Sequence, residues 1–250
     1  MPEGDTIFRT ARTLQAAIGG REVTRFESVL PKLERVDYDT PLAGRTVEKV
    51  EANGKWLLIY FSGDLILLTH MLMSGSWHIY RPGERWQRPR NEMRIVIETD
   101  AMVAVAFRVP VAEFHTAHSL ARREGLNQLG PSALAENFDA ETAVANLASR
   151  PDLELGLALL DQRLIAGLGN LFKSEVAFAC GLSPFRTVAS LSRIQLEELV
   201  TTSRRLLQAR PVPNVYGRAG EPCRRCGTSI RSAKHRDDGR VSFWCPVCQT

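Results

Sequence analysis

The segment PCRRCGTSIRSAKHRDDGRVSFWCPVCQ, residues 222–249, contains four of the five cysteines of the chain. Cys223 and Cys226 form one Cys-x2-Cys pair, and Cys245 and Cys248 form a second pair after eighteen intervening residues. Two such pairs allow two turns to present four thiolates to one tetrahedral Zn²⁺ ion. Because four protein ligands leave no open position for a substrate, the spacing predicts one structural zinc ion.

Two short strand-like pieces, residues 228–232 and 241–244, lie between the cysteine pairs around a turn at residues 237–239. This pattern predicts a β-hairpin zinc ribbon, in which the metal supplies the folding free energy that a small core cannot. Two disulfides are the alternative in an exported protein, but nothing in the sequence suggests export. A redox Cys-x-x-Cys is also disfavoured, because no βαβ pattern surrounds the cysteines. The fifth cysteine, Cys180, follows an apolar string and is expected to be a buried bystander.

The basic residues gather at the C-terminal end of the chain. Residues 201–250 contain ten Lys or Arg against three Asp or Glu, a net charge of +7. The whole chain has a net charge of +4, so the first 200 residues carry −3. Such asymmetry is typical of a surface that binds a polyanion, although a solvated basic tail would give the same count.

The composition is that of an ordinary globular protein, with 250 residues, 44% hydrophobic and 24% charged. No apolar run approaches the roughly 18 residues of a membrane span. The first twenty residues hold acidic and basic side chains instead of the apolar stretch of a signal peptide. These observations disfavour a secreted or membrane protein, and we expect a cytoplasmic one.

Hydrophobic periodicity predicts an N-terminal helix, a β-rich half and then a helical segment. Apolar residues recur at helical spacing over residues 5–18. Over residues 22–114 short apolar runs alternate with turns, which predicts a β-sandwich or barrel, and the Asn53-Gly54 pair predicts a hairpin turn. Residues 81–94 form a Pro-rich basic loop that is expected to be mobile.

Further helices are predicted over residues 134–147, 152–160, 170–180 and 192–209. Ser190 or Ser192 is a plausible cap for the last of them. We therefore expect an α+β protein, with an N-terminal helix and β-sandwich followed by a helical domain and the zinc finger. The expected parts are residues 1–121 (catalytic β-sandwich domain), 122–131 (linker), 132–214 (helical domain) and 215–250 (zinc finger).

The N-terminal sequence Met1-Pro2-Glu3 can supply a nucleophile. Methionine aminopeptidase removes Met1 when the next residue is small, which leaves Pro2 as a secondary amine, whereas retained Met1 locks that nitrogen in an amide. Free α-amino groups titrate at about pH 7.7–8.0, so a sizeable fraction is neutral and nucleophilic at neutral pH. Such an amine attacks a sugar carbon and gives an iminium, and Glu3 beside it can move protons. Taken alone, this motif is weak evidence, because most chains that begin this way do not use it.

The sequence Gly167-Leu168-Gly169-Asn170 stands immediately before a predicted helix. Glycine lets a phosphate approach the backbone, and the N–H groups of a helix N-terminus bind anions. The segment is not a dinucleotide-binding fingerprint, because Phe172 occupies the third glycine position. An ordinary turn with an Asn cap is the alternative.

Five segments occur together in an order that is similar to a known family. They are MPEGD at 1–5, ANGKWL at 52–57, THMLMSGSW at 69–77, LLDQRLIAGLGNLFKSEVAFACGLSP at 159–184 and PCRRCG…CPVCQ at 222–249. Over nearly its whole length the sequence resembles the formamidopyrimidine-DNA glycosylase/endonuclease VIII family of base-excision repair enzymes. It most resembles the actinobacterial endonuclease VIII-like branch. The resemblance implies a helix–two-turn–helix motif in the helical domain, damaged double-stranded DNA as the partner, a monomer, and a place at the bacterial nucleoid.

The resemblance implies a bifunctional glycosylase/lyase in which one amine removes the base and nicks the strand without an organic cofactor. Pro2 would attack C1′ of the damaged nucleotide, and Glu3 would shuttle protons. Lys55 would contact the phosphate beside the lesion. The iminium would then acidify the sugar protons, so that β- and δ-elimination cut the strand.

The resemblance also implies four DNA-binding residues. Asn170, Arg240 and His70 would bind the DNA backbone, and Met73 would fill the gap that the everted base leaves. Eversion costs a few kcal/mol, and an apolar wedge offsets part of that cost. Each residue also has a plainer interpretation: Lys55 as a surface hairpin charge, Met73 as core, Arg240 as a solvated charge.

The chain departs from the family pattern in ways that bear on the lesion class. Thr6 stands where many relatives carry glutamate, and residues 106–114 lack the Asp-x-Arg-x-Phe-Gly loop of the purine-lesion branch. This absence favours oxidised pyrimidines, whereas the Met-Ser-Gly-Ser sequence at 73–76 is more like the purine branch. A purine-lesion glycosylase and a non-catalytic damaged-DNA-binding protein stay as alternatives. His115 and His118 could form a metal pair, but a polar surface is favoured.

Overall fold

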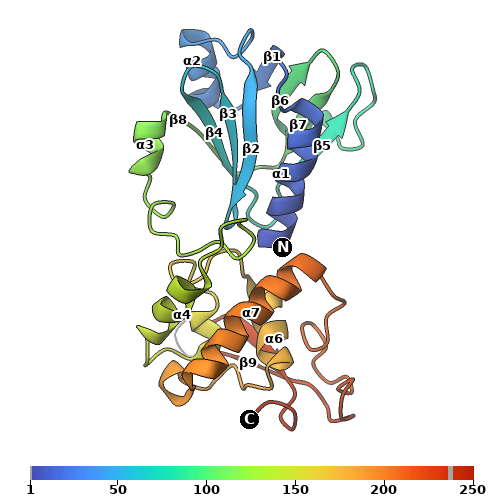
Figure 1. Ribbon diagram of the computed structural model, residues 1–250. Coiled ribbons are helices and arrows are strands. Elements are labelled where there is room, and N and C mark those ends of the chain that lie inside the picture. Colours follow the sequence, from blue (N-terminus) through green and yellow to red (C-terminus); the bar gives the residue numbers. More distant parts are fainter. Residues whose placement is uncertain (1, 236–238) are drawn as a thin grey trace. The chain divides into compact units, whose positions relative to one another are not determined.

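The computed structural model describes residues 2–235 and 239–250 (Figure 1). Met1 and most of the turn predicted at residues 237–239 lie outside the described residues. The chain divides into two compact units, residues 1–127 and 128–250, and each is described by itself.

The N-terminal unit is a β-sandwich with a helix packed against it, as the sequence predicts. Its described strands form two four-stranded antiparallel sheets, ordered β1-β6-β7-β5 and β2-β3-β4-β8. Their bounds are β1 (Val23–Ser28), β2 (Val47–Asn53), β3 (Trp56–Phe61), β4 (Leu65–His70), β5 (Ser76–Tyr80), β6 (Met93–Thr99), β7 (Val103–Phe107) and β8 (Val111–His115).

The core of this unit lies between the sheets and under helix α1 (Gly4–Ile18). Ile7 and Leu14 of α1 are buried with Leu57 and Ile59 of β3 and with Ile97 of β6. Helix α1 packs against β2, as Figure 1 shows. This packing fixes the start of the chain to the sandwich.

Two short helices of this unit, α2 (Pro31–Asp39) and α3 (Ala117–Ala121), were not predicted. The prediction of strands and turns over all of residues 22–114 is wrong for α2. Pro31 stands at the start of that helix, where the missing N–H costs nothing. Only Leu33 is buried, so the helix has almost no apolar stripe for a periodicity search to find.

The C-terminal unit contains α4 (Ala140–Ala148), α5 (Leu155–Ala158), α6 (Asn170–Ala179), α7 (Arg193–Ala209) and the hairpin of β9 (Arg231–Lys234) and β10 (Val241–Trp244). Ser192 caps α7 and Gln195 completes the capping box, which decides between the two predicted caps. The short turns η1 (Arg90–Glu92) and η2 (Val188–Ser190) complete the elements.

Two predicted helices are shorter than expected. Helix α4 begins at Ala140, capped by Asp139, because Ser132 and Ala133 bridge to Ala166 and hold the preceding chain away from a helical path. Helix α5 is limited to residues 155–158 by a bridge from Glu154 to Thr187. The hydrophobic periodicity of a segment gives no information on such long-range backbone bonds, so it does not predict these helix ends.

Candidate active site and zinc centre

Pro2 and Glu3 immediately precede helix α1. Pro2 is half-buried and Glu3 is 4% exposed. Glu3 is the N-cap residue, and its carbonyl accepts the N–H groups of Thr6 and Ile7 at 3.0 and 3.1 Å. The positive end of the helix dipole therefore lies beside the predicted nucleophile.

Lys55 lies at the tip of the β2–β3 hairpin. Asn53 pairs with Trp56, so the two-residue loop is Gly54-Lys55 and not the predicted Asn53-Gly54 pair. Gly54 has φ +58°, a left-handed conformation that glycine adopts without strain at the first loop position of a type II′ turn. The one-residue difference moves Lys55 from beside the turn into the turn itself.

His70 ends strand β4 and lies near Lys55. Its ring meets Trp56 edge-on at 4.7 Å, and its Nδ1 accepts the N–H of Leu72 at 3.1 Å. The Arg123 guanidinium stacks over Trp56 at 4.6 Å. Burial lowers the pKa of His70, and the charges of Lys55 and Arg123 lower it further. Because Nδ1 accepts, the neutral ring carries its proton on Nε2, which can donate to an acceptor such as phosphate.

The lowered pKa of His70 predicts a pH response. As the pH falls below 6.5, His70 takes up a proton more readily in the unfolded chain than in the folded chain. The free energy of unfolding therefore decreases between pH 6.5 and the lower pKa of the folded state, and the stability present above pH 6.5 is lost. An NMR titration should place the midpoint of His70 below 6.5, with the His70→Asn variant assigning the signal. A midpoint at or above 6.5 would contradict the described environment.

Met73 is 70% exposed and Leu72 is 47% exposed, whereas Met71 is 2% exposed. Met71 is therefore core, and the core interpretation does not hold for Met73. Leu72 has φ +45°, and a Cβ on Gly75 would lie 2.7 Å from the Met71 carbonyl oxygen, so this tight turn requires glycine. The turn presents two adjacent apolar side chains to solvent.

The glycine-asparagine segment turns sharply into helix α6. Gly167 has φ +109°, and Gly169 is the N-cap, so Asn170 is the first helical residue and not a cap. Gln162 was not singled out from the sequence. Its amide donates to the carbonyls of Leu160 and Leu168 at 2.9 Å and accepts the N–H of Gly167 at 3.0 Å. The Oδ1 of Asn170 is buried and has no hydrogen-bond partner within residues 2–235 and 239–250.

Three consecutive buried polar residues of α6 hold the neighbouring segments. Glu175 accepts backbone N–H groups from residues 214–216 at 2.8 Å. Lys173 Nζ donates to the Val241 carbonyl at 3.3 Å, and Ser174 Oγ accepts the N–H of Phe243 at 3.3 Å. Sequence reasoning missed their role, although charged residues on the apolar face of a helix are a usable signal.

Arg240 is exposed and immediately precedes β10. Its carbonyl accepts the N–H of His235 at 3.3 Å, which joins the two sides of the hairpin. Because Lys173 and Ser174 hold β10, the hairpin that carries Arg240 is fixed to the helix that begins at Asn170.

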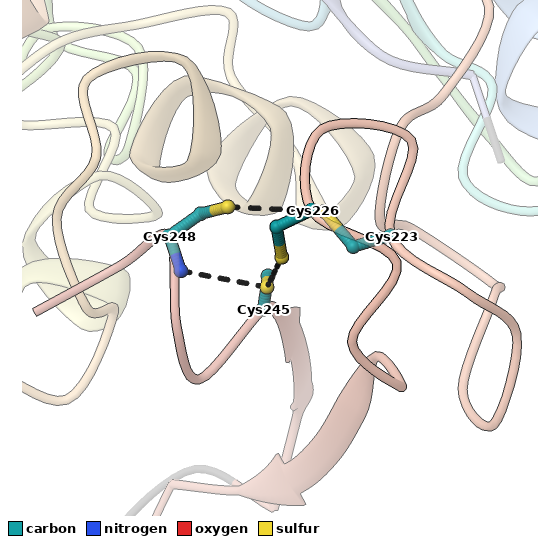
Figure 2. Close-up of side chains that lie close together, drawn as sticks. All are labelled: Cys223, Cys226, Cys245 and Cys248. Carbon is teal, nitrogen blue, oxygen red and sulfur yellow. Dashed lines mark hydrogen bonds between the residues drawn. The ribbon is translucent and has the colours of Figure 1, made fainter.

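The four predicted zinc ligands converge, as Figure 2 shows, with all Sγ atoms within 4.8 Å of one another. The Cys226–Cys245 and Cys223–Cys248 Sγ distances are 3.4 and 3.9 Å, near the roughly 3.8 Å that tetrahedral zinc with bonds of about 2.3 Å requires. Backbone N–H groups of Arg225 and Cys248 donate to the sulfurs of Cys223 and Cys245. The donor set fits a structural zinc, and all five cysteines are free of disulfides.

His115 bonds to Glu113 and Ser119. Among the described residues the four cysteines are the only group of three or more His, Cys, Asp or Glu that could hold a metal ion. Cys180 is half-buried, and burial raises the pKa of its thiol to about 11. It is therefore a protonated thiol at neutral pH.

Family models match three parts of the chain. The formamidopyrimidine-DNA glycosylase N-terminal domain matches residues 1–110, the formamidopyrimidine-DNA glycosylase H2TH domain matches 129–210, and the zinc finger found in FPG and IleRS matches 220–250. The chain is 40% identical to a probable endonuclease 8 2 of Streptomyces coelicolor, covering 100% of this chain and 94% of that protein.

The chain belongs to the formamidopyrimidine-DNA glycosylase family.

Other family relatives include the DNA-(apurinic or apyrimidinic site) lyase Nei2 of Mycolicibacterium smegmatis, at 36% identity over 100% of this chain and 99% of that protein. The predicted resemblance to the actinobacterial endonuclease VIII-like branch is confirmed by these relatives. A crystal structure of Lactococcus lactis Fpg with abasic-site DNA aligns over 100% of both chains, with a TM-score of 0.85 and 22% identity. This likeness confirms the formamidopyrimidine-DNA glycosylase fold.

Proposed function

We propose that this chain is a bifunctional DNA glycosylase and AP lyase of base excision repair that removes oxidised bases, with pyrimidines favoured. The observation that carries the proposal is the position of Pro2 and buried Glu3 at the positive end of α1, in a chain of this family. Relatives named endonuclease 8 and AP lyase support the same activity class.

The proposed reaction uses the amine of Pro2 after removal of Met1. Its nitrogen forms a bond to C1′ as the glycosidic bond breaks, and the electron pair leaves with the base, which takes up a proton. Glu3 moves protons in this step, and opening of the sugar gives an iminium. Loss of the C2′ proton then expels the 3′ phosphate, and a second elimination expels the 5′ phosphate.

The proposed DNA contacts come from both units. Lys55 and His70, which the structure brings together, would bind phosphate beside the lesion. Asn170 and Arg240, fixed to one helix and hairpin, would bind the backbone from the other unit. Phosphate contacts of this kind position the duplex without reading its sequence.

We expect one zinc ion, held by the four cysteines, a monomeric enzyme, and a place at the nucleoid in the bacterial cytoplasm. None of the described helices is long and apolar enough to cross a membrane.

Borohydride trapping on abasic-site DNA, followed by peptide mapping, tests the proposed function. We expect a covalent adduct on Pro2 of a correctly processed chain. Excision of thymine glycol and dihydrouracil should exceed excision of 8-oxoguanine. An absent adduct would leave only DNA binding, and preferred excision of 8-oxoguanine would assign the purine-lesion branch that the Met-Ser-Gly-Ser sequence resembles.

Met73→Ala should slow base excision from duplex DNA about tenfold, because the gap left by the everted base loses its apolar filler. Excision from the same lesion in a single strand should change much less, since no stack has to be replaced. Single-turnover rates on both substrates measure the effect. Val29→Ala, which also removes an exposed apolar side chain, is the control. Equal slowing on both substrates would contradict a wedge.

A further inference from the structure

The face of the β1-β6-β7-β5 sheet that points away from the sandwich core carries a cavity of about 690 Å³ under residues 81–90. Val96 and Val103 line it from the sheet, and Trp86 lines it from the covering segment. A volume of this size is typical of small-molecule sites. Five arginines also line the cavity: Arg25, Arg81, Arg85, Arg88 and Arg90.

Aromatic contacts of Trp86 hold the covering segment, residues 81–90, against the sheet, although the sequence predicts a mobile loop here. Trp86 meets Phe107 edge-on at 5.7 Å and lies 6.4 Å from Tyr80. The N–H of Gln87 donates to the Tyr80 hydroxyl at 3.2 Å. The guanidinium of Arg90 lies 5.4 Å from the centre of the Trp86 ring. The covering segment is thus held against the sheet by its own side chains.

The charge of the cavity is positive and only partly compensated. Carboxylates pair with three of the arginines, Arg25, Arg88 and Arg90. Glu84 and Glu98 also line the cavity, and the Glu84 carboxylate accepts the backbone N–H of Arg81 at 2.8 Å. Arg81 and Arg85 are exposed, and the ion pairs between described residues at this cavity involve neither guanidinium. The two guanidinium groups are therefore available to bind an anion. Phosphate accepts two parallel hydrogen bonds from such a group.

The cavity is separate from the proposed wedge. Strand β5 connects the turn of Met73 to the covering segment, and its five residues span about 17 Å. None of the residues proposed for catalysis or DNA binding lines the cavity. The inference therefore stands independently of the proposed lyase.

We propose that this cavity binds an unpaired nucleotide, with the base against Trp86 and the valine floor and the phosphate on Arg81 and Arg85. A nucleobase offers a flat π face to the aromatic wall, and base–aromatic stacking tolerates any sequence. The carboxylate side chains of an acidic peptide would satisfy the arginines but leave the apolar surfaces without contact. The source is a free nucleotide or an unpaired stretch of DNA.

Photocrosslinking of the full-length protein tests the site with two probes. One is free 5-iodo-2′-deoxyuridine monophosphate, and the other is a single-stranded hexamer that carries this nucleotide. We expect peptide mapping to find the adduct on Trp86. Labelling by both probes identifies free nucleotides as sufficient, whereas labelling by the hexamer alone identifies a strand. If neither probe gives an adduct on Trp86, the proposal is overturned. Binding of an acidic peptide in place of a nucleotide would give this result.

Arg81→Ser/Arg85→Ser should reduce the Trp86 adduct about tenfold at limiting probe, because both phosphate donors are lost. Lys32→Ser/Arg35→Ser is the matched control, since it removes the same charge from exposed positions of α2. Trp86→Leu, which keeps an apolar side chain, should lower probe affinity several-fold. An unchanged adduct in the arginine variant, or an equal loss in the control, overturns the phosphate assignment. Borohydride trapping of each variant shows separately whether the catalytic amine still works.

Discussion

Blocking the N-terminal amine should abolish the borohydride-trapped adduct, by roughly 10³-fold or more, because the amine is the proposed nucleophile and no second one replaces it. A chain that keeps Met1 is the simplest block, since the nitrogen of Pro2 is then an amide. Trapping on abasic-site DNA, quantified beside a processed chain, measures the loss. DNA affinity should change little, because the residues proposed to bind phosphate are untouched.

Pro2→Gly provides the matched control for this prediction. It keeps an N-terminal amine but replaces the secondary ring nitrogen by a primary one. We expect some lyase activity on abasic DNA to survive while much of the glycosylase activity is lost. Equal retention of both activities would contradict a special role of the ring. Undiminished trapping by the Met1-retaining chain would place the nucleophile elsewhere.

Cys245→Ser should release the zinc and unfold the finger. Structural zinc sites contribute about 10–16 kcal/mol of apparent binding free energy, so losing one of four thiolates removes most of the finger's stability. Arg240 then loses its fixed position, and the salt-dependence slope of DNA binding should fall by about 1. Metal analysis and affinity titrations at several salt concentrations measure the two effects.

Cys180→Ser is the control for the zinc prediction, because Cys180 is a half-buried thiol outside the cluster. It should keep both the zinc and the salt slope. Full zinc content in Cys245→Ser would contradict the four-cysteine site. Unchanged DNA affinity after loss of zinc would show that the finger lies outside the interface.

The zinc centre was predictable because both ligand pairs are local in sequence, and their spacing alone specifies two metal-binding turns. Helices α1 and α7 were predictable from periodicity and caps. The shortened α4 was not, because backbone bonds to Ala166, far along the chain, override local preference. The Gln162 bonds that shape the turn before α6 are local, but they are made by a side chain and do not follow hydrophobic periodicity, so the pattern does not predict them.

The difference between Met71 and Met73 shows a further limit. Both are apolar residues of one short segment, and hydrophobic periodicity gives no reason to bury one and expose the other, although the family resemblance singles out Met73. The decision depends on where β4 ends and on the left-handed Leu72, which reverses the chain. The hairpin at Lys55 shows the same limit, since strand register decides which two residues form the loop.

The side chains of buried Lys173, Ser174 and Glu175 join helix α6 to the β9–β10 hairpin and to the chain before it through hydrogen bonds to backbone groups. Amide protons in these segments should therefore exchange with solvent as one cooperative foldon. A chelator that strips the metal would then loosen the turn at Asn170 as well. The finger accordingly supports the turn at Asn170, which is proposed to bind phosphate and contains no metal ligand.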